Sequence, residues 1–446
     1  MMEKKSPSVS VIIPVFNPGD GIKKCLYSVQ NQTLKDIEII FIDDLGTDDS
    51  MEVVRNAAKN DPRIVILVNN VNSGAGYSRN RGIEASTGNY LSFIDPDDYI
   101  SEDFLELLYK KAEKTNADIV KGRPEHIDIH GVINNKDAST PLNAVIRAGL
   151  LAKKPIYSLF TYNHWTAIFR RKMIMRTGAR YGLARNSQDS VFLLRACFDA
   201  KSLEIEENAI YYYVSREKSR MRDCSEFRLQ QEMISAKDMV SFIQPRYNGS
   251  RSQREYLCSK LRYLLCVQTW AMQTDGMRDA AERFLSEIRT YTSSLPFAED
   301  LKKTSPIINV LLTYGYNLSI EPYRIQGLQQ SILSYIETAK RWADFMEKYP
   351  ENQTNHSLGY NWKKLYVQAL TNPQLGKNGL SRAEKRRYYK ELRKSTKKVK
   401  NTSILKKSKS IHLFLLTGIN FFAVRRVIKS VIVKFLTPAK KKKTAI

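Results

Sequence analysis

The chain has 446 residues, of which 42% are hydrophobic, and a formal net charge of +25 at pH 7. This length allows two or three domains, and the apolar content predicts a folded core. No uninterrupted apolar run reaches the roughly 18 residues that a membrane-spanning helix needs, and the short charged segment before Ser10 is unlike a signal peptide. The five cysteines show no metal-ligand spacing, which favours a reduced cytosolic interior over a disulfide framework or a zinc site.

Most of the positive charge belongs to the C-terminal tail. From Lys377 onward the chain carries 22 Lys and Arg against two acidic residues, a net charge of +20, so the first 376 residues carry only +5. The high net charge is therefore a property of the tail and gives no indication of what the rest of the chain binds.

The first 120 residues alternate apolar, β-rich runs with helical stretches. Strands are predicted over residues 9–15, 37–42, 63–68 and 90–94. Helices are predicted over residues 21–31, 49–60, 78–86 and 102–112, the last with Ser101 as a candidate cap. Such alternation is typical of a mostly parallel α/β sheet, in which ligands bind outside the carboxyl ends of the strands.

Polar residues follow three of these strands where each strand ends. They are Asn17 after the first strand, Asp43-Asp44 after the second and Asp95-Pro96-Asp97-Asp98 after the fourth. Carboxylates this close repel one another unless a cation holds them, and Mg²⁺ or Mn²⁺ prefers oxygen ligands. Taken alone, the last cluster is equally consistent with a turn, because Asp and Pro are common turn residues. Three strand ends at one edge of a sheet favour the metal site.

The remainder of the chain is organised differently. Residues 121–222 are less regular and include a predicted helix over 189–200. Helical periodicity then dominates, with apolar residues at spacings of three and four over residues 256–272, 278–291 and 328–348. We expect an α-helical domain over residues 226–376 and a basic amphipathic tail over 377–446.

Several short motifs occur in a fixed order along residues 8–222. They are Pro14-Val15-Phe16-Asn17, Asp43-Asp44, Gly46-Thr47-Asp48-Asp49-Ser50, Asn72-x-Gly74, Arg79-Asn80-x-Gly82, Gly88-Asn89-Tyr90, Asp95-Pro96-Asp97-Asp98, Gln188-Asp189 and Tyr211-Tyr212-Tyr213. In this order the motifs resemble family 2 glycosyltransferases. The resemblance implies a Rossmann-like GT-A fold over residues 1–225, a nucleotide-diphosphate-sugar donor, a divalent metal and inversion at the anomeric carbon.

The resemblance also implies roles for individual residues. The donor site would contain Pro14, Phe16, Asn17, Asp44, Asn72, Gly74, Arg79, Asp95 and Asp97. Phe16 and Asp44 would contact the base, for which UDP is favoured, and Arg79 would approach the diphosphate. Asp95 and Asp97 would hold Mn²⁺ or Mg²⁺, which neutralises negative charge on the leaving phosphate.

Asp189 falls at the position of the general base. The acceptor hydroxyl must lose its proton as it attacks, and a carboxylate within about 2.6–3.2 Å can accept that proton. The alternative is that Asp189 is the N-cap of the helix that follows it. His164 and Trp165 are candidates for an acceptor platform, with a buried structural role as the alternative.

The sequence departs from the family pattern at three places. Gln188 replaces the Glu that usually precedes the base, Leu45-Gly46 replaces Gly-Ser after the two aspartates, and Val214 stands where members often have Arg. None of these changes removes a residue that the chemistry requires.

The tail mixes basic clusters with apolar residues between Leu413 and Phe435. We expect it to lie on the anionic inner face of the cell membrane, beside a glycan or lipid-linked acceptor. The alternative is a solvated basic helix docked on the helical domain. The expected protein is thus a cytosolic, membrane-peripheral transferase of hexosyl or N-acetylhexosaminyl type that builds a surface polysaccharide, capsule or lipopolysaccharide.

Two other functions stay open at this point. A nucleic-acid-binding module would account for the Lys and Arg runs around Tyr388 and Tyr389. The apolar residues of the tail favour lipid instead, and no helix-turn-helix, RNP or zinc pattern appears, so we expect no nucleic-acid partner. A donor-binding homologue without activity is the second alternative, raised by Gln188. The sequence does not identify the sugar, the acceptor or the oligomeric state.

Overall fold

The computed structural model describes residues 6–128, 132, 155–159, 163–215, 224–272, 274–318, 341–342, 344–345, 348–349 and 390. The chain divides into two compact units. Unit 1 comprises Met1–Asp223 with Gln230–Tyr256, and unit 2 comprises Cys224–Leu229 with Leu257–Ile446. The sequence places the domain boundary at residue 225, whereas the structure groups Gln230–Tyr256 with the N-terminal unit. The tail predicted to bind membranes lies outside the described residues apart from Lys390.

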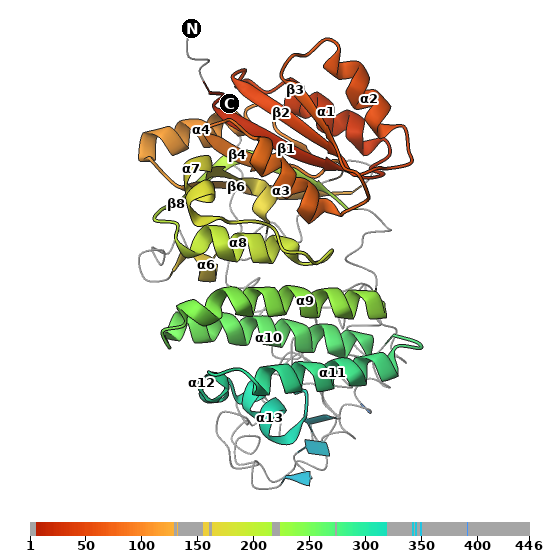
Figure 1. The fold of residues 1–446 in the computed structure, drawn as a ribbon, viewed down its shortest axis with the longest axis vertical. Helices are drawn as coiled ribbons and strands as arrows, with labels where there is room; N and C mark the ends of the chain where they lie inside the picture. The colour runs from red at the N-terminus through yellow and green to blue at the C-terminus, as the bar shows by residue number, and fades with distance from the viewer. Residues whose placement is uncertain are drawn as a thin grey trace, which may run out of the picture. The chain divides into compact units, whose positions relative to one another are not determined.

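Unit 1 is built on one eight-stranded mixed sheet (Figure 1). Its strands are β1 (Val9–Val15), β2 (Ile37–Asp43), β3 (Ile64–Val68), β4 (Tyr90–Phe93), β5 (Tyr99–Ile100), β6 (Ile119–Ile127), β7 (Ala167–Arg170) and β8 (Leu203–Val214). The strand order is β3-β2-β1-β4-β7-β6-β8-β5. The first four strands of this order run parallel to one another, and β8 runs parallel to β6. The pairs β4–β7, β6–β7 and β5–β8 are antiparallel.

Helices connect and cover these strands. They are α1 (Gly21–Gln30), α2 (Ser50–Ala58), α3 (Ala75–Ala85), α4 (Phe104–Thr115), α6 (Ile156–Leu159), α7 (Arg171–Thr177) and α8 (Gln188–Phe198). Helix α3 contacts β1 and β2, and α4 contacts β6 and β8. Strand β1 is buried along its whole length, as its continuous apolar run predicts for a central parallel strand.

The approach of α3 to the sheet depends on Gly82. A Cβ atom at this position would clash with Cγ2 of Ile12 on β1 and lie 3.2 Å from Cδ1 of Ile42 on β2. A larger residue would therefore push the helix away from the strands that end at the polar clusters.

Two predicted helix starts are wrong. Helix α3 begins at Ala75 rather than at 78, because Gly74, with φ of 87°, ends the preceding loop and the helix follows it directly. Helix α4 begins at Phe104 rather than at 102, and Ser101 does not cap it. The Ser101 hydroxyl instead accepts a hydrogen bond from the backbone N–H of Ile210 on β8.

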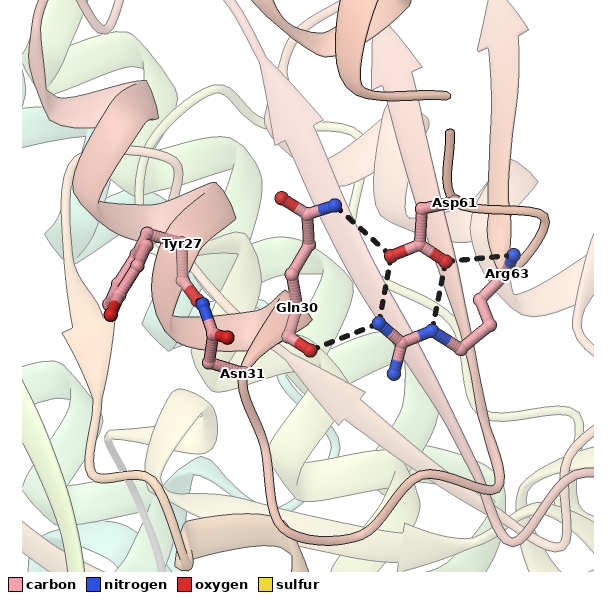
Figure 2. Close-up of polar contacts among 5 residues, drawn as sticks. All are labelled: Tyr27, Gln30, Asn31, Asp61 and Arg63. Atoms are coloured by element: carbon pink, nitrogen blue, oxygen red, sulfur yellow. Dashed lines mark hydrogen bonds and ion pairs between the residues drawn. The ribbon is translucent and has the colours of Figure 1, made fainter. Parts of the chain in front are cut away.

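A polar network ties the C-terminal end of α1 to the turn before β3 (Figure 2). The guanidinium of Arg63 donates to both carboxylate oxygens of Asp61, at 2.9 and 2.7 Å, and to the carbonyl oxygen of Gln30 at 3.0 Å. The amide of Gln30 donates to Asp61 at 3.1 Å. Beside it, Asn31 donates from its side chain to the carbonyl of Tyr27. These bonds hold the pKa of Asp61 at about 2, mainly through the hydrogen bond from Arg63.

The rest of the described chain is helical, as the apolar periodicity predicts. It contains α9 (Glu226–Ile243), α10 (Arg251–Ala271), α11 (Arg278–Ser293), α12 (Ala298–Thr304) and α13 (Pro306–Tyr314). Most of the helix predicted over 328–348 lies outside the described residues. None of the helices in the described ranges is long and apolar enough to cross a membrane.

Candidate functional site

A cavity of about 430 Å³ lies at the carboxyl ends of β1, β2 and β4. Nine of the residues that line it are those expected at a donor site: Pro14, Phe16, Asn17, Asp44, Asn72, Gly74, Arg79, Asp95 and Asp97. Pro14 lies in β1 and Arg79 in the second turn of α3, and the others come from the loops that follow β1, β2, β3 and β4. The rule that ligands bind where parallel strands end thus predicted where these side chains meet.

Asp44 organises the loop that leads into α3. One of its carboxylate oxygens accepts hydrogen bonds from the side chain of Asn69 at 2.6 Å and the N–H of Ser73 at 2.8 Å. The other accepts from the N–H of Gly74 at 2.8 Å. The residue is 2% exposed, so these bonds satisfy a carboxylate that burial would otherwise penalise. They fix the residues 69–74 that form one wall of the cavity.

The loop after β2 is shaped by Asn17. Its side-chain oxygen accepts from the N–H groups of Thr47 and Asp48, at 2.6 and 3.3 Å. A Cβ atom at Gly46 would lie 2.8 Å from that oxygen and 3.0 Å from the backbone nitrogen of Asn17, so glycine is required there. Leu45 adopts a left-handed φ of 60°, which is unfavourable for leucine. Leu45-Gly46 differs from the Gly-Ser of the family pattern, but it keeps a glycine where the loop comes closest to Asn17.

An ion pair joins the buried Arg79 to the partly exposed Asp95 in the turn after β4. Arg79 donates to Asp95 at 2.5 Å, and the Arg79 side chain is 6% exposed. Its Nε and Nη1 groups are buried and have no hydrogen-bond partner among the described residues. The guanidinium also lies over the ring of Tyr181, 5.3 Å from its centroid. Buried N–H groups without partners are costly, which indicates a site for an anionic or polar ligand.

The third acid of this turn has a structural role. Asp98 accepts hydrogen bonds from the hydroxyl of Tyr211 and the N–H of Val214, both at 2.9 Å. The same hydroxyl accepts from the N–H of Asp95 at 3.1 Å. Burial, followed by the charges of Asp97 and Asp95, raises the pKa of Asp98 well above its ordinary value. Asp98 therefore links the turn to β8, and Asp95 and Asp97 are the acids left to face a ligand.

Residues 10–178 match the family model described as Glycosyl transferase family 2. This part of the chain is therefore similar to glycosyltransferases of family 2. The chain is 28% identical over 228 residues to the Uncharacterized glycosyltransferase YibD of Escherichia coli, an alignment covering 48% of this chain and 62% of that protein. It is 31% identical over 217 residues to the Putative glycosyltransferase EpsH of Bacillus subtilis, covering 47% and 61%.

A third relative has a more specific name. The chain is 31% identical over 212 residues to the Poly(ribitol-phosphate) beta-N-acetylglucosaminyltransferase TarP of Staphylococcus aureus, covering 46% of this chain and 62% of that protein. In all three alignments the chain spans about three-fifths of the relative's own length.

Asp189 lies in the first turn of α8, beyond the residues that match the family model. Asp189 is the second residue of that helix, and the N-cap position is Ser187, so the alternative prediction that Asp189 caps the helix is wrong. The side chain of Gln188 packs 3.0 Å from the position of a Cβ atom at Gly76, which brings the starts of α8 and α3 together. Burial alone would lower the pKa of Arg79, but nearby acidic groups, Asp95 and Asp189 among them, outweigh burial and raise this pKa above its ordinary value. Asp189 thus lies within electrostatic range of the cavity wall.

His164 and Trp165 do not form the predicted acceptor platform. They are 3% and 8% exposed, and neither is among the described residues that line the cavity. His164 lies 5.4 Å from the ring of Tyr181, and burial followed by the charge of Arg79 lowers its pKa well below the ordinary value. Trp165 packs on Tyr211 with ring centroids 4.3 Å apart. The buried structural role accounts for both side chains.

The cavity wall also contains residues that were not predicted as site residues. Five of them, Val15, Pro18, Ala75, Pro96 and Asp98, lie beside predicted ones in the sequence, whereas Arg185, Tyr213 and Val214 come from other parts of the chain. Tyr213 belongs to the Tyr211-Tyr212-Tyr213 motif and lies on β8. Val214 is the position where family members often have Arg, so that departure lies at the cavity itself. Arg185 belongs to no motif, and no sequence signal could have identified it.

The acids of the cavity fit a divalent metal. No cluster of three or more His, Cys, Asp or Glu arranged to hold a metal occurs in the described part of the chain. Mg²⁺ and Mn²⁺ sites in nucleotide enzymes need only one or two protein carboxylates, because substrate phosphates complete the coordination. Asp95 and Asp97, both partly exposed on the cavity wall, supply that donor set.

Proposed function

We propose that this chain is an inverting, metal-dependent glycosyltransferase that moves a sugar from a nucleoside-diphosphate donor to an acceptor hydroxyl. The observation that carries the proposal is the cavity at the strand ends, whose wall contains all nine residues expected at a donor site. The match of residues 10–178 to the family 2 model supports the same reaction class.

The polar groups of the cavity suit a diphosphate. Arg79 is buried and presents two N–H groups without partners among the described residues, and phosphate oxygens would satisfy them. Phe16 is exposed at the cavity and offers an aromatic face to a base, for which the resemblance favours uracil. Asp44 holds the loop beside it.

Asp95 and Asp97 would hold Mn²⁺ or Mg²⁺. When bound, the metal supplies positive charge against the developing charge of the leaving diphosphate. Arg79 keeps Asp95 in place through their ion pair, and Asp98 fixes the turn through Tyr211 and β8. The chain therefore orients the two carboxylates before any ligand binds, which reduces the cost of organising the site.

Asp189 would accept the proton of the acceptor hydroxyl. Its position at the start of α8, beside the start of α3, supports this role because Arg79 on α3 lines the donor cavity. Attack from the side opposite the leaving group would give inversion. The acceptor class we propose is a cell-surface glycan or lipid-linked glycan. The S. aureus relative is named a poly(ribitol-phosphate) beta-N-acetylglucosaminyltransferase, which supports a surface polymer. We also propose that the tail over residues 377–446 binds anionic membrane lipid on the cytoplasmic side.

The test is release of nucleoside diphosphate from a panel of UDP-, GDP- and CDP-sugars, with and without Mn²⁺. One nucleotide class should be consumed only with metal, and Asp97→Ala should abolish the release. Asp103→Ala is the matched control, because Asp103 is an exposed acid outside the cavity. Consumption that is independent of metal, or unchanged in Asp97→Ala, would contradict the proposal.

A further inference from the structure

Arg185 contacts Asn72 of the cavity wall, a residue 113 positions away in the sequence. Its Nη1 donates to the side-chain oxygen of Asn72 at 2.7 Å, and its Nη2 donates to the carbonyl oxygen of the same residue at 2.9 Å. The stem of the arginine passes over Gly74, where a Cβ atom would lie 3.6 Å from its Cγ. The guanidinium thus binds the 69–74 loop through Asn72. The same loop donates hydrogen bonds to Asp44 from the N–H groups of Ser73 and Gly74.

The segment that carries Arg185, residues 182–187, is anchored at both ends. Tyr181 precedes it and exchanges two hydrogen bonds with the side chain of Asn80 on α3, at 2.8 and 3.1 Å. At the other end, the Ser187 hydroxyl donates to Glu232 on α9 at 2.7 Å. Between these anchors Leu183 is 92% exposed, so the middle of the segment reaches into solvent.

The same segment leads directly into the proposed general base. Ser187 has a left-handed φ of 55°, and α8 begins at the next residue, with Asp189 in its first turn. The N–H of Arg185 donates to the side chain of Gln231 on α9 at 2.7 Å, which fixes the backbone from which the side chain extends. A movement of the 69–74 loop would therefore also move Arg185 and the 182–187 segment, which ends two residues before Asp189.

The charge of Arg185 also suits an anionic ligand. The cavity wall holds four acids, Asp44, Asp95, Asp97 and Asp98, against the two arginines Arg79 and Arg185. Arg79 is already paired with Asp95. In the described ranges the hydrogen bonds of the Arg185 guanidinium go to Asn72, and no carboxylate is paired with it.

From these contacts we infer that Arg185 is a positioning residue that couples nucleotide binding at the 69–74 loop to the 182–187 segment before Asp189. This inference rests on the proposed function. It goes further in assigning to Arg185 a role that connects the donor cavity with the placement of the base.

The test combines affinity with hydrogen exchange of the full chain, using UDP and Mn²⁺ as the probe, or whichever nucleoside diphosphate the panel above selects. In the wild type, nucleotide should slow amide exchange in both the 69–74 loop and the 182–187 segment. Arg185→Ala should weaken nucleotide binding about 10-fold, because the 69–74 loop would lose the two charge-assisted hydrogen bonds that hold Asn72 in place. At saturating nucleotide this variant should still protect the 69–74 loop but leave exchange in the 182–187 segment unchanged. Arg185→Lys keeps the positive charge but cannot make two parallel hydrogen bonds from one planar group. In this variant the protection of residues 182–187 by nucleotide should lie between that of the wild type and that of Arg185→Ala.

Arg170→Ala is the matched control. The Arg170 guanidinium likewise bonds an asparagine side-chain oxygen and a carbonyl, those of Asn116 and Ala117, both at 2.9 Å, and it does not line the cavity. This variant should lose stability and keep both nucleotide affinity and the coupled protection. If the wild type binds nucleotide but Arg185→Ala shows the same protection of residues 182–187, the coupling is refuted and the donor site stands. If the wild type binds no nucleoside diphosphate, the proposed function fails and the coupling fails with it.

Discussion

The network of Gln30, Asp61 and Arg63 predicts a defined dependence of stability on pH (Figure 2). The Asp61 side chain is 10% exposed, and its pKa is lowered from 3.8 to about 2, mainly by the hydrogen bond from Arg63. A shift of nearly two pKa units corresponds to about 2 kcal/mol of stability. Because the folded-state pKa is below the unfolded one, this contribution is fully present above about pH 4 and is lost as the pH falls toward 2.

The perturbation is Asp61→Asn, which removes the charge and keeps the size of the side chain. Thermal unfolding of the full chain should show a midpoint lowered at pH 7 by roughly 4–8 °C, taking 2–4 °C per kcal/mol for a unit of this size. As the pH falls from 5 toward 2.5, the midpoints of variant and wild type should converge. Asp20→Asn is the control, since Asp20 forms only an exposed pair with Lys23 and should shift the midpoint very little. A difference between Asp61→Asn and wild type that stays constant from pH 7 to pH 2.5 would refute the reasoning.

The remaining predictions concern packing, chemistry and the tail. Gly82→Ala should lower stability by roughly 1–3 kcal/mol in urea unfolding, because the added methyl would clash with Ile12, and an unchanged midpoint would contradict the account of α3 packing. Asp189→Asn should keep nucleotide binding and reduce sugar transfer by about 10²–10⁴-fold, and normal transfer would exclude it as the base. Deletion of residues 377–446 should abolish sedimentation with anionic vesicles while leaving nucleotide binding intact; unchanged sedimentation would place lipid binding elsewhere.

The position of the cavity could be predicted from the sequence because its residues follow strands. Asn17, Asp44 and Asp95 each come shortly after an apolar run, and parallel strands bring such positions to one edge whatever the details of packing. The predicted α/β fold of the N-terminal part of the chain is confirmed. It could be predicted because the periodicity of its strands and helices is a local property of the sequence.

Other features depend on contacts that no local pattern encodes. Arg185 reaches Asn72 only because two loops meet in the folded chain, so it matched no motif. Aromatic side chains suit sugars, which makes His164 and Trp165 candidates for an acceptor platform, yet the sequence does not distinguish an exposed aromatic side chain from a buried one. The helix start at Ala75 does not show in the sequence, because a loop containing glycine lacks helical periodicity. In the structure the N–H of Gly74 donates to Asp44 and fixes the end of that loop.

The central claim is that the cavity at the strand ends binds a nucleoside diphosphate through a metal held by Asp95 and Asp97. Calorimetric titration of UDP, GDP and CDP into the full chain, each with and without Mn²⁺, tests it most directly. The account predicts that one nucleotide binds strongly only with Mn²⁺ and that Asp97→Ala loses this binding while Asp103→Ala retains it. No binding by any nucleotide, or equal binding by wild type and Asp97→Ala, would contradict it.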